Sequence, residues 1–184
     1  MEDDRTTTAP AIELRTFTTL APVRDGLVDV YSEVRAPLLH LPNYAVTAFG
    51  ERLGRHAAEP GFTAVLAYAD AYPVGYAYGN TIEHGDRYWQ RTSPAPAETY
   101  TERPALALKE IGVRLAWRKT GTARRIHDAL LATRDELYAT LMVNPAAGDG
   151  RVHALYESWG YKDIGRSQPA PASPVLTVMI YVSR

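Results

Sequence analysis

A glycine stands among basic residues about two thirds of the way along the sequence, in LAWRKTGTARRIHDALL at positions 115–131. A helical pattern begins at Gly121, and a helix N-terminus attracts phosphate through its unpaired backbone N–H groups and its dipole. Glycine lets the backbone approach a ligand where a Cβ would intrude, and Ala123 keeps the next turn small. The basic residues around the turn are Arg118, Lys119, Arg124 and Arg125. We interpret the turn as a site for a diphosphate.

Other phosphate and metal chemistries find little support in the sequence. The turn contains neither GxxxxGKS/T nor GxGxxG, which argues against a nucleoside triphosphatase or a dinucleotide oxidoreductase. The histidines show no HxxxH or HExxH spacing and the chain has no cysteine, so we expect no metal and no thiol nucleophile. The alternative for the turn itself is a simple helix start with solvated arginines.

The elements that must position this turn are expected to form one domain. The chain has 184 residues, 46% of them hydrophobic, and a net charge of -1. This balance of charge argues against binding to nucleic acid or to a membrane surface, and no apolar run approaches the ~20 residues that span a bilayer. We expect a disordered lead at 1–10, a single domain at 11–184, a cytoplasmic location, and either a monomer or a homodimer.

Apolar periodicity predicts an α/β protein with a mixed sheet and the element order β-α-α-β-β-β-α-β-α-β-β. The predicted strands are 11–17, 62–70, 72–81, 105–116, 137–144, 161–165 and 174–182. The predicted helices lie between about 22 and 58 with a break at 41–43, from 121 onward, and at 150–161. The aperiodic segment 84–104 is rich in proline and aromatic residues, so we interpret it as a lid or binding loop, with a disordered insertion as the alternative.

Two motifs together resemble one protein family. Arg118-x-x-Gly121-x-Ala123 resembles the R/Q-x-x-G-x-G/A signature of the GNAT superfamily of acyl-CoA-dependent N-acetyltransferases. About 35 residues on, HALYESWGY at 153–161 resembles the family's xxLYexxGF helix, and the element order agrees from 11 to 182. The longer pattern ARRIHDALL…LYESWGY is similar to members of this superfamily that are common in actinobacteria. The resemblance implies a three-layer αβα fold in which strand 105–116 splays away from the next parallel strand.

The resemblance also implies acetyl-CoA as the donor substrate. Its pantetheine arm would lie between the splayed strands and hydrogen-bond the backbone near Val113 and Leu115. Family members often have an asparagine seven residues before the helical tyrosine; here that position is Asp149, and Asn144 at the strand end is the substitute we consider. The residues implied to hold the diphosphate are Arg118, Lys119, Thr120, Gly121, Thr122, Ala123 and Arg124.

Acetyl transfer to an amine needs a proton for the departing thiolate and a path for the proton that the amine loses. By resemblance, Tyr156 is the general acid; a phenol of pKa about 10 can protonate a thiolate whose conjugate acid has a pKa of about 8.5. The alternative is a core residue on an apolar helical stripe. Glu110, an acid within an apolar strand, is the best candidate base, although it could simply face water. Weaker candidates are Glu33, His84 and Glu98, and we expect His127 and His153 to be solvated.

These residues favour an N-acetyltransferase that acts on a primary amine of a small molecule by direct attack. The segment 84–104 and the two N-terminal helices would form the acceptor site. The alternatives are a non-catalytic acyl-CoA-binding module, a protein N-acetyltransferase, and an aminoacyl-tRNA-acetylating toxin. The balanced charge argues against the toxin, because such an enzyme needs a strongly basic face.

Overall fold

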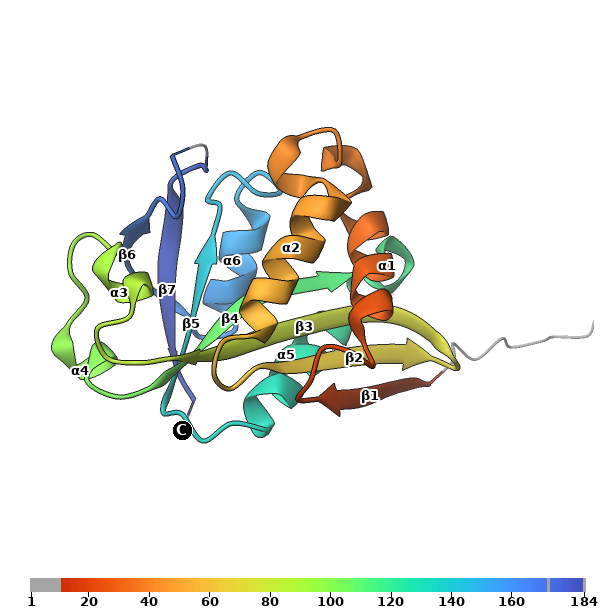
Figure 1. The fold of residues 1–184 in the computed structure, drawn as a ribbon, viewed down its shortest axis with the longest axis horizontal. Helices are drawn as coiled ribbons and strands as arrows, with labels where there is room; N and C mark the ends of the chain where they lie inside the picture. The colour runs from red at the N-terminus through yellow and green to blue at the C-terminus, as the bar shows by residue number, and fades with distance from the viewer. Residues whose placement is uncertain (1–10, 172, 184) are drawn as a thin grey trace, which may run out of the picture.

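The computed structural model describes residues 11–171 and 173–183, and the predicted lead at 1–10 lies outside that part (Figure 1). The described chain forms one seven-stranded sheet with the order β1-β2-β3-β4-β5-β7-β6. The strands are β1 (Ile12–Phe17), β2 (Thr63–Ala69), β3 (Tyr72–Ile82), β4 (Ala105–Val113), β5 (Tyr138–Val143), β6 (Lys162–Ser167) and β7 (Leu176–Val182). The predicted mixed α/β sheet is confirmed.

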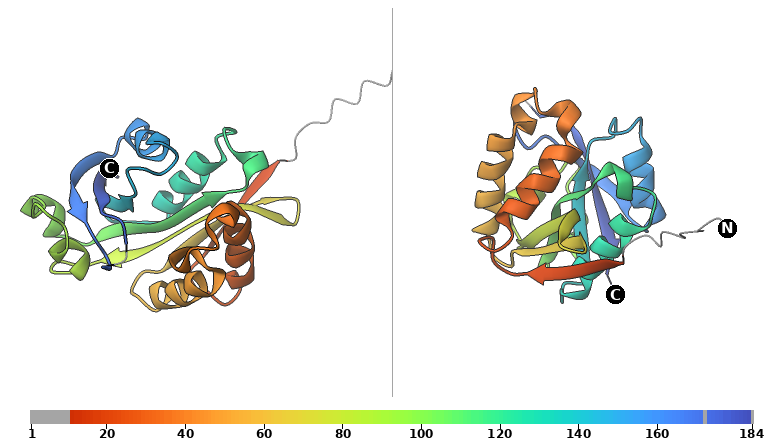
Figure 2. Two further views of the ribbon diagram at one scale, coloured as in Figure 1. Left: turned by 90° about the horizontal axis from the view of Figure 1, so that it is seen from above. Right: turned by 90° about the vertical axis from the view of Figure 1, so that its right-hand side faces the viewer.

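Helices cover both faces of the sheet, as Figure 2 shows. The longer ones are α1 (Arg24–Val34), α2 (Val46–Ala57), α5 (Thr122–Ala132) and α6 (Arg151–Ser158). Helices α1 and α2 lie on one face and α5 and α6 on the other, which gives the three layers. Short helices α3 (Arg87–Gln90) and α4 (Glu98–Thr101), and 3-10 turns η1 (Ala36–Leu38), η2 (Pro42–Tyr44) and η3 (Leu115–Trp117), complete the chain.

Strands β4 and β5 are the parallel pair in the middle of the sheet, and they separate part of the way along. Their pairing runs from Ala105↔Tyr138 to Leu108↔Leu141 and then stops, although β4 continues to Val113. On its other side β4 stays paired with β3 as far as Val113. The predicted splay is therefore present, and beyond Leu108 one edge of β4 has no partner strand within the described ranges.

The α1–α2 layer is held to the sheet by aromatic packing. Tyr31 of α1 and Phe49 of α2 stack with ring centroids 3.7 Å apart, and Phe49 also contacts Tyr76 of β3. All three side chains are fully buried. Rings of this size remove much apolar surface from water. This contact fixes the two helices against each other and against the strand that pairs with β4.

The α5–α6 layer packs on the opposite face and contains a buried histidine. Ile126 and Leu130 of α5 are buried against the sheet. His127, expected to be solvated, is only 1% exposed, so that prediction is wrong. Its Nε2 lies 2.9 Å from the hydroxyl of Tyr161 and its Nδ1 lies 3.0 Å from Asp128. Burial lowers the pKa of His127, although the hydrogen bond with Asp128 opposes that shift.

Two segments differ from the sequence prediction. The strand predicted to 116 ends at Val113, because Arg114 turns inward. Its Nε donates to the carbonyl oxygen of Pro73 at 2.7 Å, and its guanidinium pairs with Asp29 and Glu33. A buried guanidinium requires such partners, and the chain continues as the 3-10 turn η3.

The predicted second helix start at 41–43 is also different. Residues 36–44 form the turns η1 and η2, each with a proline at its start, and α2 begins only at Val46. Proline fits the first turn of a helix but cannot continue one, so this stretch breaks into short 3-10 pieces.

The segment 84–104 packs on the sheet as a folded element. Trp89 is buried, and the Tyr88 hydroxyl lies 3.0 Å from Oγ1 of Thr140 on β5. Ser93 forms an isolated bridge to Arg166 of β6. The disordered-insertion alternative is therefore wrong. Within the described ranges, no helix combines the length and the apolar character needed to cross a bilayer.

Candidate active site

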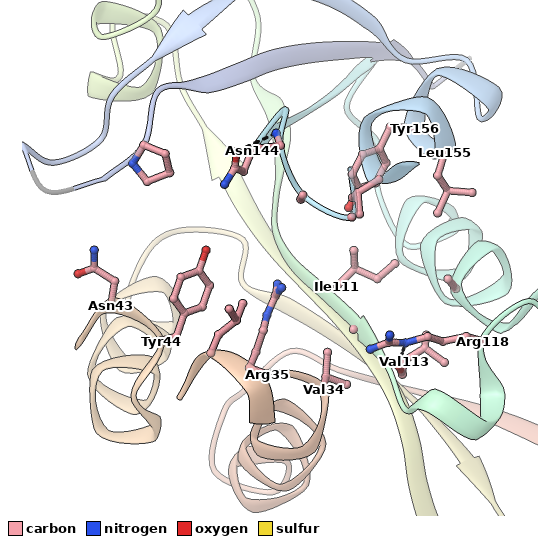
Figure 3. A pocket seen from close by; sticks show the side chains of 18 of the residues that line it. Val34, Arg35, Asn43, Tyr44, Ile111, Val113, Arg118, Asn144, Leu155 and Tyr156 are labelled. Atoms are coloured by element: carbon pink, nitrogen blue, oxygen red, sulfur yellow. Dashed lines mark hydrogen bonds between the residues drawn. The ribbon is translucent and has the colours of Figure 1, made fainter. Parts of the chain in front are cut away.

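A cleft of about 1030 Å³ opens where β4 and β5 separate (Figure 3). Its floor is Ile111, Gly112 and Val113 of β4. One wall, the α1–α2 half of the cleft, comprises Val34, Arg35, Leu38, Leu41, Pro42, Asn43 and Tyr44. The opposite wall, the α5–α6 half, comprises Arg118, Ala123, Asn144, Ala146, Ala147, Gly148, Val152, Leu155, Tyr156 and Trp159. Pro174 lines it from the connection between β6 and β7.

The turn before α5 presents a row of free backbone donors. Lys119 and Gly121 both have left-handed backbone angles, with φ 61° and 82°. Among the described residues, none accepts a hydrogen bond from the backbone N–H groups of Lys119 to Arg124. A Cβ built on Gly121 would meet no protein atom within 4 Å, so the space beside it is open. The turn therefore has the geometry of an anion site.

The basic side chains of the turn are placed differently from one another. Arg118 lines the cleft, and its Nε donates to the Val113 carbonyl oxygen at 3.2 Å. Arg124 pairs with Asp128 at 2.8 Å, and Arg125 donates to the backbone of β1. Only Arg118 of the four lies in the cleft wall itself.

The other predicted residues of the turn fall into two groups. Ala123 lines the cleft and leaves room beside α5. Thr122 is buried, and its Oγ1 lies 2.7 Å from that of Thr120. Thr120 in turn donates to the Trp117 carbonyl oxygen at 2.7 Å. The two threonines thus hold the shape of the turn with their side chains, and their N–H groups remain in the free row.

The two predicted pantetheine contacts differ in position. Val113 ends β4 on the unpaired edge and lines the cleft. Leu115 lies in η3, is 73% exposed, and is not part of the lining. The structure therefore brings Val113 into the cleft and leaves the Leu115 side chain in solvent.

Of the two candidates for the missing asparagine contact, only one faces the cleft. Asn144 lines it, and its Oδ1 accepts a hydrogen bond from the Ala146 N–H at 3.0 Å. The Asp149 side chain is 94% exposed, pairs with Arg151 and is not part of the lining. Asp149 sits in the left-handed region with φ 56°, at the far side of the loop from β5. The aspartate that stands where family members often have asparagine therefore points its side chain into solvent and not into the cleft.

Tyr156 belongs both to the core and to the cleft. Its ring is buried in T-shaped contacts with Trp159 and Tyr161, at 5.5 and 5.8 Å between centroids. Its hydroxyl points into the cleft above Ile111 and has no hydrogen-bond partner among the described residues (Figure 3). Burial, with a smaller contribution from the charge of Glu110, raises the pKa of Tyr156 above its ordinary value. The phenol is therefore fully protonated at neutral pH.

Glu110 lies one residue before the cleft floor and is held by a cation. Its Oε1 accepts a hydrogen bond from Nη2 of Arg35 at 2.8 Å, and its side chain is 13% exposed. The pairing of β3 and β4 is irregular between Tyr78 and Gly79, opposite Glu110. The ion pair with Arg35 explains why an acidic residue stands within this apolar strand. Glu110 is a neighbour of the cleft rather than part of its lining.

The weaker base candidates lie away from the cleft lining. Glu33 is engaged by Arg114, and His84 contacts the carbonyl oxygen of Thr101. His153 of α6 is also outside the lining; its Nε2 lies 2.8 Å from Oδ1 of Asp163 on β6, and its side chain is 21% exposed. Neither Glu98 nor any other residue of 84–104 is among the lining residues. The expectation that this segment helps to form the acceptor wall is therefore wrong for the described cleft, because the segment packs on the sheet instead.

The residues that sequence reasoning missed are those of the α1–α2 half. Figure 3 shows Arg35, Asn43 and Tyr44 directed into the cleft from the end of α1 and the turn η2. The prolines at 37 and 42 could have signalled that this stretch is not one regular helix. No cluster of three or more potential ligand side chains that could hold a metal occurs in the described ranges.

Comparisons with known proteins identify the fold. No protein-family model and no curated protein sequence matches the chain. Solved structures do match, and two of them are described as acetyltransferases of the GNAT family. An aminoglycoside 6'-acetyltransferase type Ii has a TM-score of 0.63 and 18% identity, over 94% of this chain and 97% of that one.

Two further structures match over similar lengths. The paia N-acetyltransferase from Thermoplasma acidophilum, in complex with coenzyme A, has a TM-score of 0.57 and 13% identity, over 94% of this chain and 99% of that one. The ribosomal-protein-S18-alanine N-acetyltransferase from Escherichia coli has a TM-score of 0.62 and 12% identity, over 94% of both chains. The described chain has the fold of the GNAT acetyltransferases.

Proposed function

We propose that this protein, which has the GNAT fold, transfers an acetyl group from acetyl-CoA to a primary amine of a small molecule. The observation that carries the proposal is the cleft at the splayed strands. An unpaired strand edge and the Tyr156 hydroxyl lie in this one space, and Arg118 and Ala123 of its wall stand beside a row of free N–H groups. A matching structure of the same fold is a complex with coenzyme A, which supports the same donor here.

The donor would bind along the α5–α6 half of the cleft. The N–H groups of Lys119 to Arg124, with the α5 dipole and Arg118, form a positive site for the diphosphate. The pantetheine arm would follow the unpaired edge of β4, whose backbone groups can bond its amides. Asn144 faces the same gap from the end of β5. The Asp149 side chain lies outside this arrangement, and a backbone contact of the arm near Leu115 stays a prediction.

The chemistry is a direct attack. The amine nitrogen forms a bond to the thioester carbonyl carbon, the carbon–sulfur bond then breaks, and the thiolate takes the proton of the Tyr156 hydroxyl. The raised pKa of Tyr156 makes it a weaker acid than a free phenol. The same buried surroundings also make the thiolate more basic, because desolvation penalises both anions. Position rather than acidity is therefore the requirement for this proton transfer.

The proton lost by the amine needs an acceptor, and Glu110 remains our candidate for it. Its Oε1 is engaged by Arg35, so a proton would reach the carboxylate through a water molecule at the cleft floor. Arg35 also lines the cleft, which supports a position of the incoming amine next to this ion pair. This role requires no direct contact between Glu110 and the acceptor.

The test is a thiol-release assay with the purified full chain, acetyl-CoA and a panel of amines, with mass spectrometry of the products. The panel holds aromatic monoamines, polyamines, aminoglycosides, amino acids and a peptide with a free N-terminus. We expect acetylation of at least one small amine. Binding of acetyl-CoA by calorimetry without any acetylated product would instead favour the non-catalytic module. Acetylation of the peptide alone would favour a protein N-acetyltransferase.

A further inference from the structure

The charged side chains around the cleft indicate which class of acceptor the cleft can bind. Among the described residues that line the cleft, the charged side chains are those of Arg35 and Arg118, and no Asp or Glu is included. Arg118 lies in the α5–α6 half, beside the proposed diphosphate site. Arg35 lies in the α1–α2 half, and Glu110 balances its charge. An acceptor with several positive charges would find no carboxylate in the cleft wall.

The α1–α2 half is otherwise apolar. Apart from Arg35 and Asn43, this half consists of Val34, Leu38, Leu41, Pro42 and Tyr44. Pro174 adds to this apolar surface from the β6–β7 connection. Leu41 is 40% exposed although it is a large hydrophobic residue. Exposed apolar surface gathered in a concave site is typical of a binding site for an apolar ligand.

Arg35 and Tyr44 give this half its flat surfaces. The guanidinium carbon of Arg35 lies 5.9 Å from the centroid of the Tyr44 ring. Arg35 is also fixed by its hydrogen bond to Glu110, so its plane has a defined orientation. A fixed guanidinium and a phenol ring both stack favourably on an aromatic ring. The Tyr44 side chain points into the cleft from η2 (Figure 3).

From this lining we infer that the acceptor is a primary monoamine with an apolar, aromatic body, and that polyamines and aminoglycosides are rejected. The inference rests on the proposed acetyl transfer and names the substrate class of the same site. An apolar wall favours the neutral amine over its ammonium form, and only the neutral amine attacks. For a polycation the cleft has two costs, because the additional ammonium groups lose water and meet Arg35 in the α1–α2 half or Arg118 in the α5–α6 half.

The first experiment compares 2-phenylethylamine with spermidine and kanamycin as acceptors for the wild-type chain at fixed acetyl-CoA. We expect kcat/KM for 2-phenylethylamine to exceed that for either polycation on the order of 10²-fold, a discrimination within reach of pocket contacts. A preference for a polycation, or equal turnover of all three, would overturn the inference and leave the acetyl transfer intact. Acetyl-CoA binding without turnover of any amine would overturn the proposed function, and this inference with it.

The second experiment changes the charge of the wall. Leu41→Asp places a carboxylate in the α1–α2 half at a position that is already partly exposed. We expect the spermidine to 2-phenylethylamine ratio of kcat/KM to rise on the order of 10-fold, since a single charge a few ångströms away at a partly exposed position is worth a factor of this order. Val182→Asp, at an exposed position at the end of β7, is the matched control and should leave the ratio unchanged. An unchanged ratio in Leu41→Asp, or an equal rise in the control, would contradict the inference.

Discussion

The two halves of the cleft present different kinds of chemical group to a ligand. The α5–α6 half lies beside backbone groups: a row of N–H donors before α5 and, on the cleft floor, the unpaired edge of β4. The α1–α2 half offers side chains carried by two 3-10 turns. A backbone site tolerates many sequences and suits a ligand that never changes, whereas a side-chain site changes with each substitution. Substitutions in the α5–α6 half should therefore lower activity by the same factor for every acceptor. For substitutions in the α1–α2 half the factor should depend on the acceptor.

The largest effect is expected for Tyr156→Phe. Phenylalanine keeps the ring contacts with Trp159 and Tyr161 and removes only the hydroxyl in the cleft. We expect kcat to fall on the order of 10³-fold, in the range for a positioned general acid. The KM for acetyl-CoA should stay nearly constant. Steady-state kinetics with two acceptors of different size should give the same fold-loss, because the thiolate is common to both reactions.

Tyr88→Phe is the matched control for that variant. It also removes a buried hydroxyl, one that lies 3.0 Å from Oγ1 of Thr140 and outside the cleft lining. We expect the free energy of unfolding to fall by about 1 kcal/mol, the net value of a typical hydrogen bond, with kcat unchanged. Full turnover in Tyr156→Phe, or a loss that differs between acceptors, would remove the general-acid role and weaken the distinction between the halves.

The same distinction explains what the sequence could predict. The turn at Gly121 and the helix of Tyr156 have short local patterns, because a left-handed glycine and an amphipathic stripe are requirements of a few neighbouring residues. The splay of β4 from β5 was predicted from the resemblance that these patterns carry. The apolar wall of Leu38, Leu41 and Tyr44 had no such pattern.

Longer-range contacts account for the remaining errors. His127 is buried because Tyr161, more than thirty positions later, supplies its hydrogen bond. Arg114 ends β4 early because its partners Asp29 and Glu33 lie on α1. Neither pairing has a local signal, since both depend on how the helices pack on the sheet. For the same reason the segment 84–104 gave the composition of a lid but packs on β5 and β6.

Glu110→Gln tests the border between the two halves. Glutamine still accepts a hydrogen bond from Arg35 but cannot take a proton. We expect kcat/KM for 2-phenylethylamine at pH 7 to fall on the order of 10²-fold, the lower end for a positioned base, and to recover as the pH approaches the pKa of the amine. With aniline, whose amine is neutral at pH 7 and has only the amide-forming N–H proton to lose, the loss should be smaller and should not change with pH above neutrality. An equal loss with both amines at every pH would assign Glu110 to the positioning of Arg35 alone.

The smallest effect is expected for Gly121→Val, and it concerns donor affinity only. The valine Cβ and its methyl groups would enter the open space beside the free N–H row, where no protein atom lies within 4 Å. We expect the Kd for coenzyme A, measured by calorimetry, to rise about 10-fold, equivalent to ~1.4 kcal/mol. The Kd for pantetheine, which has no diphosphate, should not change.

Backbone strain is the competing explanation, because valine is disfavoured at a φ of 82°. Gly85→Val separates the two effects. Gly85 has φ 78°, also has no protein atom within 4 Å of its Cβ position, and is not part of the cleft lining. Both variants should lose about 1–3 kcal/mol of stability to strain, and only Gly121→Val should lose affinity for coenzyme A. If both variants bound coenzyme A equally well, or if Gly121→Val weakened pantetheine as much as coenzyme A, the diphosphate would not contact this turn. The backbone groups that bind the donor would then be those along the unpaired edge of β4 alone.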